Sequence, residues 1–178
     1  MEIRRLPVTD EALRRFVAEL WLPYHRELAT EVDAHALANR PDGELIAENV
    51  EFYRERFETE GARAWVVVES DRVDPATAPC THPEVELHGH VLTSVDACPS
   101  VFDRPDRLVV GDLFVTEPHR GSGLADRLIA RATTDARDQG CGELRLDVAV
   151  DNDRARAFYE TQGFEPYREQ LIRPVSGT

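Results

Sequence analysis

A strand pattern that passes through a glycine-rich turn directly into a helix pattern is the feature that most constrains the fold of this chain. It lies in the stretch VVGDLFVTEPHRGSGLADRLIARA, residues 109–132 of 178. The first half is rich in valine, leucine and phenylalanine, whereas leucine, isoleucine and alanine recur at helical spacing in the second half. The stretch therefore predicts a strand, a loop and a helix in succession, a connection from which α/β sheets are built.

Periodicity predicts further elements on both sides of this stretch. Two or three amphipathic helices are expected between residues 9 and 60, where Thr9 can cap the first helix and Pro23 ends or kinks it. Two more helices are expected at residues 124–138 and 152–163. Apolar runs and alternating patterns predict six strands, at residues 2–8, 64–70, 87–97, 107–117, 143–150 and 164–175.

The order of these elements indicates the fold class. Strand, helices, three strands, helix, strand, helix, strand describes an α/β fold with a mixed, mostly antiparallel central sheet flanked by helices. No repeat or linker divides the chain, and its length suits one domain, so a single domain is expected over residues 1–178.

The glycines of the central stretch predict an anion site. Gly121 and Gly123 have no Cβ, so a ligand can approach their backbone closely, and the first N–H groups of a helix have no acceptor within the helix. The helix dipole adds about half a positive charge there, which suits a phosphate or pyrophosphate. Gly111, inside the strand, marks a bulge or the close approach of another backbone.

Two common phosphate-binding loops do not fit this stretch. A P-loop needs a lysine, and the chain has none. A dinucleotide fingerprint needs glycine or alanine at the position of Asp126. A third pattern, R-x-x-G-x-[GA], is matched by Arg120, Gly123 and Ala125 at the strand-loop-helix junction.

Further along the chain, NDRARAFYETQGF follows the next predicted strand as residues 152–164. Together with the glycine loop, it resembles the signature of the GNAT superfamily of N-acetyltransferases, and the strong part of the resemblance covers residues 108–167. The resemblance implies the acyl-CoA N-acyltransferase fold and acetyl-CoA as the co-substrate. It places the cofactor half at about 108–167 and the acceptor-binding helices at about 9–60.

The resemblance also implies roles for individual residues. Asn152 would contact the cofactor, and Phe114 and Val115 would pair through their backbone with its pantetheine arm. Tyr159 stands where the family often places the general acid that protonates the departing CoA thiolate. The backbone of the loop would hold the pyrophosphate through Arg120, Gly121, Ser122, Gly123, Leu124 and Ala125.

The implied chemistry needs an acid and a base, because an amine attacks the thioester, an oxyanion forms and the thiolate leaves. A phenol with a pKa of about 10 is a suitable proton donor to a thiolate. Asp112, on the strand beside the expected acetyl position, is the candidate base. Both residues have structural alternatives, since Tyr159 could pack against the sheet and Asp112 could be exposed or pair with an arginine.

The acceptor, a small-molecule or peptide amine, is expected at the early helices. An aromatic wall with carboxylates would suit such a ligand, although the aromatic residues could equally belong to the core. The residues that could line this pocket are Trp21, Tyr24, His25, Glu27 and Glu31. A non-catalytic acyl-CoA-binding regulatory module and a nucleotide-binding protein are the alternative functions.

The charge of the chain narrows the range of partners. There are 34 acidic residues against 21 basic ones, all of them arginine, for a net charge of −13. Such a surface repels a phosphate backbone, which argues against nucleic acid as a partner. The acidic, lysine-free composition resembles that of proteins from salt-loving organisms, so the acidity reflects either this habit or a cationic substrate.

The remaining signals exclude other classes of protein. Cys80, Cys98 and Cys141 are odd in number and widely spaced, which indicates free thiols. His88 and His90 could bind metal, but no third ligand is signalled, so no metal is expected. The chain has neither a span of about 20 apolar residues nor an apolar signal segment, so a cytoplasmic protein away from the membrane is expected. Family habit leaves a homodimer open.

Overall fold

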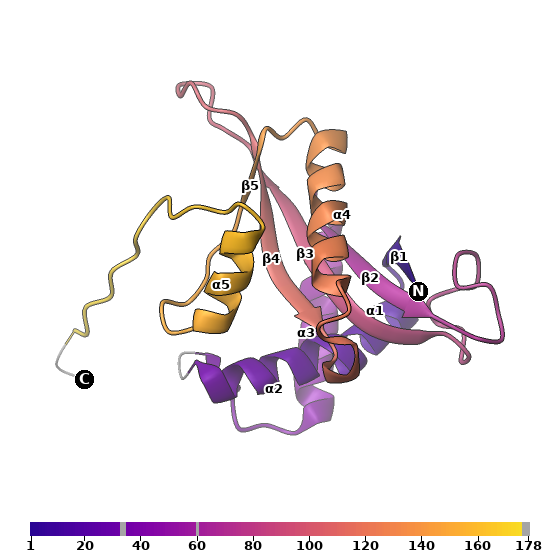
Figure 1. Cartoon of the computed structure of the whole chain (residues 1–178). Coiled ribbons are helices and arrows are strands. Elements are labelled where there is room, and N and C mark those ends of the chain that lie inside the picture. Colours follow the sequence, from indigo (N-terminus) through magenta and orange to yellow (C-terminus); the bar gives the residue numbers. More distant parts are fainter. Residues whose placement is uncertain (33–34, 60, 176–178) are drawn as a thin grey trace.

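A five-stranded sheet forms the centre of the part of the chain that the computed structural model describes, residues 1–32, 35–59 and 61–175 (Figure 1). Its strands follow one another in sequence order, and β5 runs parallel to β4 whereas the other neighbours are antiparallel. The strands are β1 (Glu2–Arg5), β2 (Arg63–Glu69), β3 (Glu86–Asp96), β4 (Arg107–Val115) and β5 (Glu143–Arg145). The predicted mixed, mostly antiparallel sheet is confirmed.

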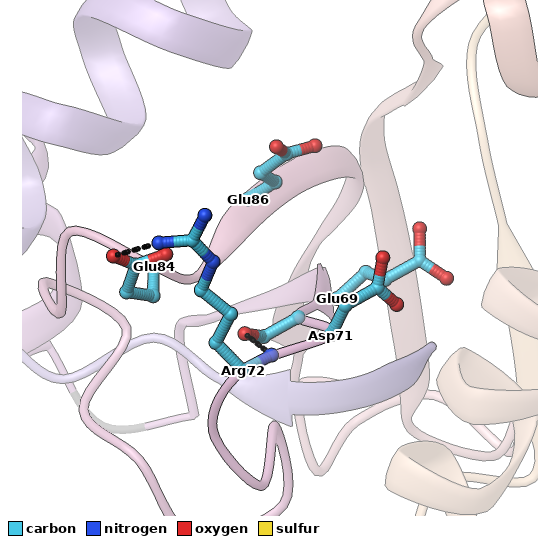
Figure 2. A pocket seen from close by; sticks show the side chains of 6 residues that line it. Glu69, Asp71, Arg72, Glu84 and Glu86 are labelled. Carbon is cyan, nitrogen blue, oxygen red and sulfur yellow. Dashed lines mark hydrogen bonds and ion pairs between the residues drawn. The ribbon is translucent and has the colours of Figure 1, made fainter.

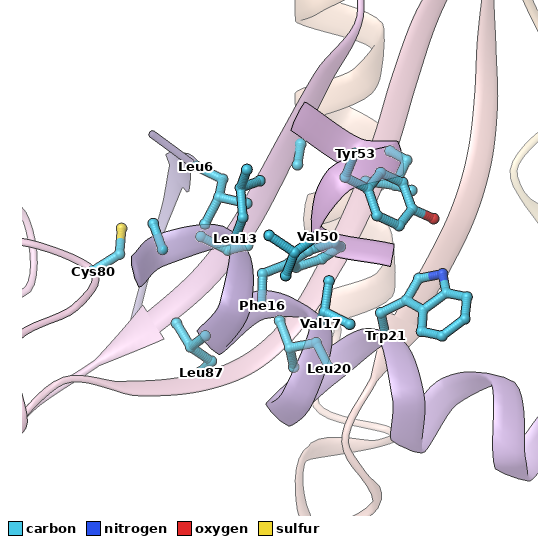
Figure 3. Packing of buried hydrophobic residues seen from close by; sticks show 14 of the residues in the cluster. Leu6, Leu13, Phe16, Val17, Leu20, Trp21, Val50, Tyr53, Cys80 and Leu87 are labelled. Atoms are coloured by element: carbon cyan, nitrogen blue, oxygen red, sulfur yellow. The ribbon is translucent and has the colours of Figure 1, made fainter. Parts of the chain in front are cut away.

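Helices cover both faces of this sheet. They are α1 (Asp10–Phe16), α2 (Leu22–Glu31), α3 (Asp42–Glu58), α4 (Leu124–Asp138) and α5 (Asp153–Thr161). The first three pack on one face, in a core that includes Leu13, Val17 and Val50 (Figure 3). On the other face, α4 buries the predicted stripe, in which Leu128 and Ala132 have no exposed surface. In the described ranges, no helix has both the length and the apolar character needed to cross a membrane.

The first two helices are joined without a loop. Thr9 caps α1, because its side-chain oxygen accepts a hydrogen bond from the N–H of Ala12 at 3.3 Å. A π-helical turn, Val17–Trp21, follows α1, and Pro23 stands at the start of α2. Since proline has no N–H to donate to the turn before it, the regular hydrogen-bond ladder is interrupted at this point. The predicted cap is confirmed. The first helix ends at Phe16, before the π-helical turn, and the chain stays helical through Pro23, so Pro23 does not end the helix.

The strand that carries the glycine motif is irregular along its second half. The register of β3 against β4 shifts beside Leu92, so that this residue faces both Gly111 and Asp112. On the other side of β4, pairing with β5 ends at Val109 and Arg145. The bulge predicted from Gly111 is thus present, and within the described ranges the backbone of β4 beyond Val109 has no strand partner on the β5 side.

Two of the predicted strands differ from the structure. The strand expected over residues 143–150 ends at Arg145, and the strand expected over residues 164–175 is wrong, because this segment has no regular secondary structure. Leu171 and Ile172 are 92% and 94% exposed, and Figure 1 shows the segment leading away from the sheet. A strand needs the backbone of a partner for its hydrogen bonds, and an alternating sequence does not supply one.

A buried carboxylate ties α4 to the sheet. Asp135 has no exposed surface, and it accepts hydrogen bonds from Trp65 Nε1 at 3.2 Å and Thr93 Oγ1 at 2.7 Å. It also forms an ion pair with Arg63. The donors come from β2 and β3, so the carboxylate fixes the position of α4 across two strands. A buried charge of this kind is tolerated because both carboxylate oxygens of Asp135 have donors.

Removal of this carboxylate should destabilise the fold strongly. We expect Asp135→Ala to lower the free energy of unfolding by about 3–5 kcal/mol, because the partly buried guanidinium of Arg63 and the buried hydroxyl of Thr93 lose their partner. Chemical denaturation gives the value. The control is Asp138→Ala on the same helix, where an exposed pair with Arg131 is lost at a cost below about 1 kcal/mol. Equal effects for the two variants would contradict the role assigned to Asp135.

Candidate functional site

A cavity of about 420 Å³ lies where β4, the glycine loop, α5 and α2 meet. The elements predicted to hold a cofactor contribute Leu113, Phe114, Val115, Arg120, Gly121, Gly123, Leu124, Ala125, Asn152, Phe158 and Tyr159. The helix α2 contributes Tyr24, Glu27, Leu28 and Glu31. Every predicted cofactor residue except Ser122 therefore lines one cavity, although the residues come from separate parts of the chain.

The glycine loop presents its backbone to this cavity. Gly121 and Gly123 have φ values of +74° and +83°, which residues with a Cβ atom rarely adopt. Gly123 is the N-cap of α4, and no side chain caps the helix there. The first N–H groups of α4 are therefore available to an anion, as the sequence predicted. Ser122 lies apart from the cavity lining, and its hydroxyl donates a hydrogen bond to the backbone oxygen of His119.

The side chain of Arg120 has a structural role in the loop. Its Nε donates a hydrogen bond to the backbone oxygen of Val115 at 3.0 Å, and its guanidinium pairs with Glu27 of α2. Arg154, on α5, lies 4.0 Å from the same carboxylate. Arg120 thus joins the end of β4 to α2, so its backbone is better placed than its side chain to hold a phosphate.

Asp112 lies beside the cavity rather than in its lining. Its Oδ2 is 3.4 Å from both the hydroxyl of Tyr53 and Nε2 of His25. Burial disfavours the charged form of Asp112, but hydrogen bonding from His25 and the nearby imidazole of His90 outweigh it and lower the pKa of the carboxyl group. The arginine partner considered from the sequence is replaced by a histidine and a tyrosine.

Tyr159 faces the cavity from α5. Its ring packs near Phe158 and Phe164, with ring centroids 5.4 and 5.6 Å away. Burial, with a contribution from the negative charge of Asp112, raises the pKa of Tyr159 to about 12. The phenol is therefore protonated near neutral pH, and both its packing and its access to the cavity are real features of the site.

Asn152 and the early helices also contribute to the cavity. The Asn152 side chain caps α5 by accepting a hydrogen bond from the N–H of Ala155 at 3.0 Å, so a structural role accompanies its position in the lining. Of the five residues considered for the acceptor side, Tyr24, Glu27 and Glu31 line the cavity. Trp21 belongs to the core at 7% exposure, and His25 faces Asp112.

Sequence reasoning did not assign a functional position to Tyr53. It lies in the region 9–60 where amphipathic helices were expected, on α3. No local pattern reveals its contact with Asp112, because the two residues are 59 positions apart and meet only when α3 packs on the sheet. Leu28, Leu113 and Arg154 of the cavity were likewise not anticipated.

A second hollow, of about 280 Å³, lies where β2 ends and β3 begins (Figure 2). Its lining is mostly acidic and consists of Glu69, Ser70, Asp71, Arg72, Glu84 and Glu86. The arginine is engaged by Glu84 at 3.3 Å. Carboxylates repel phosphate, and the hollow has no helix N-terminus among its residues, so the cavity at the glycine loop is the better anion site.

The paired histidines of β3 have packing neighbours. His90 has no exposed surface, and its ring meets that of Phe16 edge-on at 5.0 Å. Its burial lowers its pKa to about 4. His88 packs against His119, with ring centroids 4.0 Å apart. Within the part of the chain that the structure covers, no group of three metal-binding side chains is placed to hold an ion, and the three cysteines are free thiols.

Comparison with known proteins adds to this geometry. The model of the family described as Acetyltransferase (GNAT) family matches residues 36–164. Over 66 residues the chain is 32% identical to N-alpha-acetyltransferase 30 of Schizosaccharomyces pombe, an alignment covering 37% of this chain and 44% of that relative. The chain therefore matches less than half the length of this curated relative.

Two solved structures share the fold. The tetramutant of the BH1408 protein from Bacillus halodurans has a TM-score of 0.74 and 20% identity, over 98% of this chain and 100% of that one. The aminoglycoside N-acetyltransferase AAC(6')-Iy in complex with CoA has a TM-score of 0.65 and 16% identity, over 99% and 95% of the two chains. At these identities the likeness concerns the fold alone.

The glycine loop gives a direct test of the anion site. We expect Gly123→Ala to weaken the binding of CoA by about tenfold or more, because a Cβ at positive φ costs about 1–2 kcal/mol and shifts the N–H groups at the helix start. Isothermal titration calorimetry measures the affinity. The control is Gly43→Ala in α3, where an added Cβ meets nothing within 4 Å. Unchanged affinity in the Gly123 variant would remove the loop from the binding site.

Proposed function

The chain belongs to the acetyltransferase (GNAT) family, and on this premise we propose that it transfers the acetyl group of acetyl-CoA to a primary amine. The observation that carries the proposal is the single cavity in which unpaired β4 backbone, the glycine loop and the phenol of Tyr159 meet. The amine attacks the thioester directly while both substrates are bound. The acceptor is a small molecule or a peptide.

The proposed position of acetyl-CoA follows from the free backbone groups. The pyrophosphate binds the N–H groups of the loop 120–125 at the start of α4, where the helix dipole favours negative charge. The pantetheine arm lies along Phe114 and Val115, on the side of β4 that β5 leaves unpaired. The acetyl group then lies toward the bulge at Gly111 and Asp112.

The transfer proceeds through a tetrahedral intermediate. The free electron pair of the amine attacks the thioester carbon, and an unpaired backbone N–H of β4 stabilises the oxyanion. When the intermediate collapses, the C–S bond breaks and Tyr159 donates its proton to the thiolate. The high pKa of this phenol keeps the proton in place until the thiolate forms.

Asp112 is proposed as the base that takes a proton from the incoming ammonium. Its lowered pKa means that it is a carboxylate near neutral pH and can accept a proton. It also provides the negative charge that an ammonium requires, next to the aromatic rings of Tyr24 and Tyr53, whose pKa values are raised and which therefore stay neutral.

An acetyl-CoA consumption assay tests the function. A panel of peptide α-amines, lysine side chains, polyamines and aminoglycosides is offered at low and at high salt, because screening changes how an acidic protein attracts cations. The expected result is CoA release that depends on one class of amine. CoA binding without transfer to any amine would instead support a regulatory acyl-CoA-binding module.

The acid assignment has its own test. We expect Tyr159→Phe to lower kcat by about 100-fold while the affinity for CoA stays within about twofold, since the phenol acts only when the thiolate leaves. With a pKa of about 12, Tyr159 should cause no loss of activity below about pH 11. The control is Tyr167→Phe, outside the cavity. An unchanged kcat in the Tyr159 variant would exclude it as the acid.

A further inference from the structure

We propose that His25 is a positioning residue for this reaction, holding Asp112 ionised with one carboxylate oxygen directed to the acceptor. The inference rests on the proposed role of Asp112 as the base. It assigns to α2 a part in proton transfer in addition to lining the acceptor side of the cavity.

The first argument is the need of a buried nitrogen for a partner. Nε2 of His25 is buried and makes no hydrogen bond in the described part of the chain. Asp112 Oδ2, 3.4 Å away, is its ionic neighbour. An unsatisfied buried nitrogen costs about 1–3 kcal/mol, so the ring is stable there only if Nε2 carries a proton and directs it to the carboxylate. Contacts of this length in a free enzyme often shorten once substrate binds.

The second argument is that the imidazole is held in place. Its ring lies 4.3 Å from that of Trp21 and 4.7 Å from that of Tyr24, measured between centroids. Trp21 is itself buried in the core, and the ring of Tyr24 packs against Phe114 of β4 at 5.5 Å. The His25 ring is therefore fixed from two sides, which suits a residue that orients another.

The third argument is the geometry at the carboxylate. The hydroxyl of Tyr53, from α3, also approaches Oδ2 of Asp112, at 3.4 Å. Both donors thus converge on the same oxygen, and no described residue donates a hydrogen bond to Oδ1. Asp112 follows Gly111 in the bulge of β4, and the acetyl group is proposed to lie at this bulge. Oδ1 of Asp112 is therefore the oxygen left for the acceptor.

Among the groups around Asp112, His25 contributes most to stabilising the negative charge of the carboxylate. The titratable rings that face Asp112 are His25 and Tyr24 of α2, Tyr53 of α3, His90 of β3 and Tyr159 of α5. The three phenols stay neutral, and His90, with a pKa of about 4, is also neutral near pH 7. Without the His25 donor, the largest of the effects that lower the pKa of Asp112 would be lost, so this pKa would rise.

Two variants of His25 separate positioning from packing. In His25→Phe the ring remains but the donor is lost, whereas His25→Gln keeps an N–H donor at a similar reach. We expect the acidic limb of the kcat/KM profile of the Phe variant to move to higher pH by about one unit, with kcat about tenfold lower. The Gln variant should return the limb to its original position. No return of the limb in the Gln variant would overturn the proposal. An unmoved limb in the Phe variant would overturn either the positioning role of His25 or the role of Asp112 as the base, and the pKa of Asp112 shows which of the two fails.

A direct measurement distinguishes this inference from the proposed function. Carboxyl NMR titration gives the pKa of Asp112 without any turnover, and it should rise in His25→Phe and return in His25→Gln. If this pKa rises while the activity profile stays fixed, His25 positions Asp112 but Asp112 is not the base. If this pKa does not rise, the positioning role is excluded. Should the Phe variant fail to fold, His25→Leu replaces it as the variant without a donor.

Discussion

The site depends on one constraint, the interruption of backbone pairing along β4. A bulge at Gly111 and Asp112 disturbs the pairing with β3, and the pairing with β5 ends at Val109. Backbone N–H and C=O groups strongly require hydrogen-bond partners. A strand left open in this way therefore offers an extended ligand the hydrogen bonds that a longer β5 would have made. The same bulge places a carboxylate side chain at the point where the strand is irregular.

The elements around this opening are held by contacts far from it. Asp135 ties the C-terminal half of α4, the helix that follows the glycine loop, to β2 and β3. Arg120 joins the loop to α2 through Glu27, and α2 in turn brings His25 to Asp112. The helix α2 and the glycine loop are thus connected through side chains, so the two sides of the cavity keep a defined relation.

The proposed anion site relies on backbone groups rather than on a lysine side chain. It has no lysine, it carries a net charge of −13, and the side chain of Arg120 is occupied by a backbone oxygen and a glutamate. In the proposed binding mode, the N–H groups at the start of α4 supply the positive potential, and their orientation follows from the helix. Such a site needs no cluster of cationic side chains on an otherwise acidic surface.

The sequence by itself determined the strands β1 to β4, the helices, the bulge at Gly111 and the glycine loop, because each follows from local periodicity or from backbone freedom. It also indicated Tyr159 through the family pattern and Asp112 through its place on the strand beside the expected acetyl position. Only the tertiary structure decided that residues 164–175 form no strand and that His25 and Tyr53 meet at Asp112. A strand requires a partner, and a contact between α2, α3 and β4 depends on packing, so neither is encoded in local spacing.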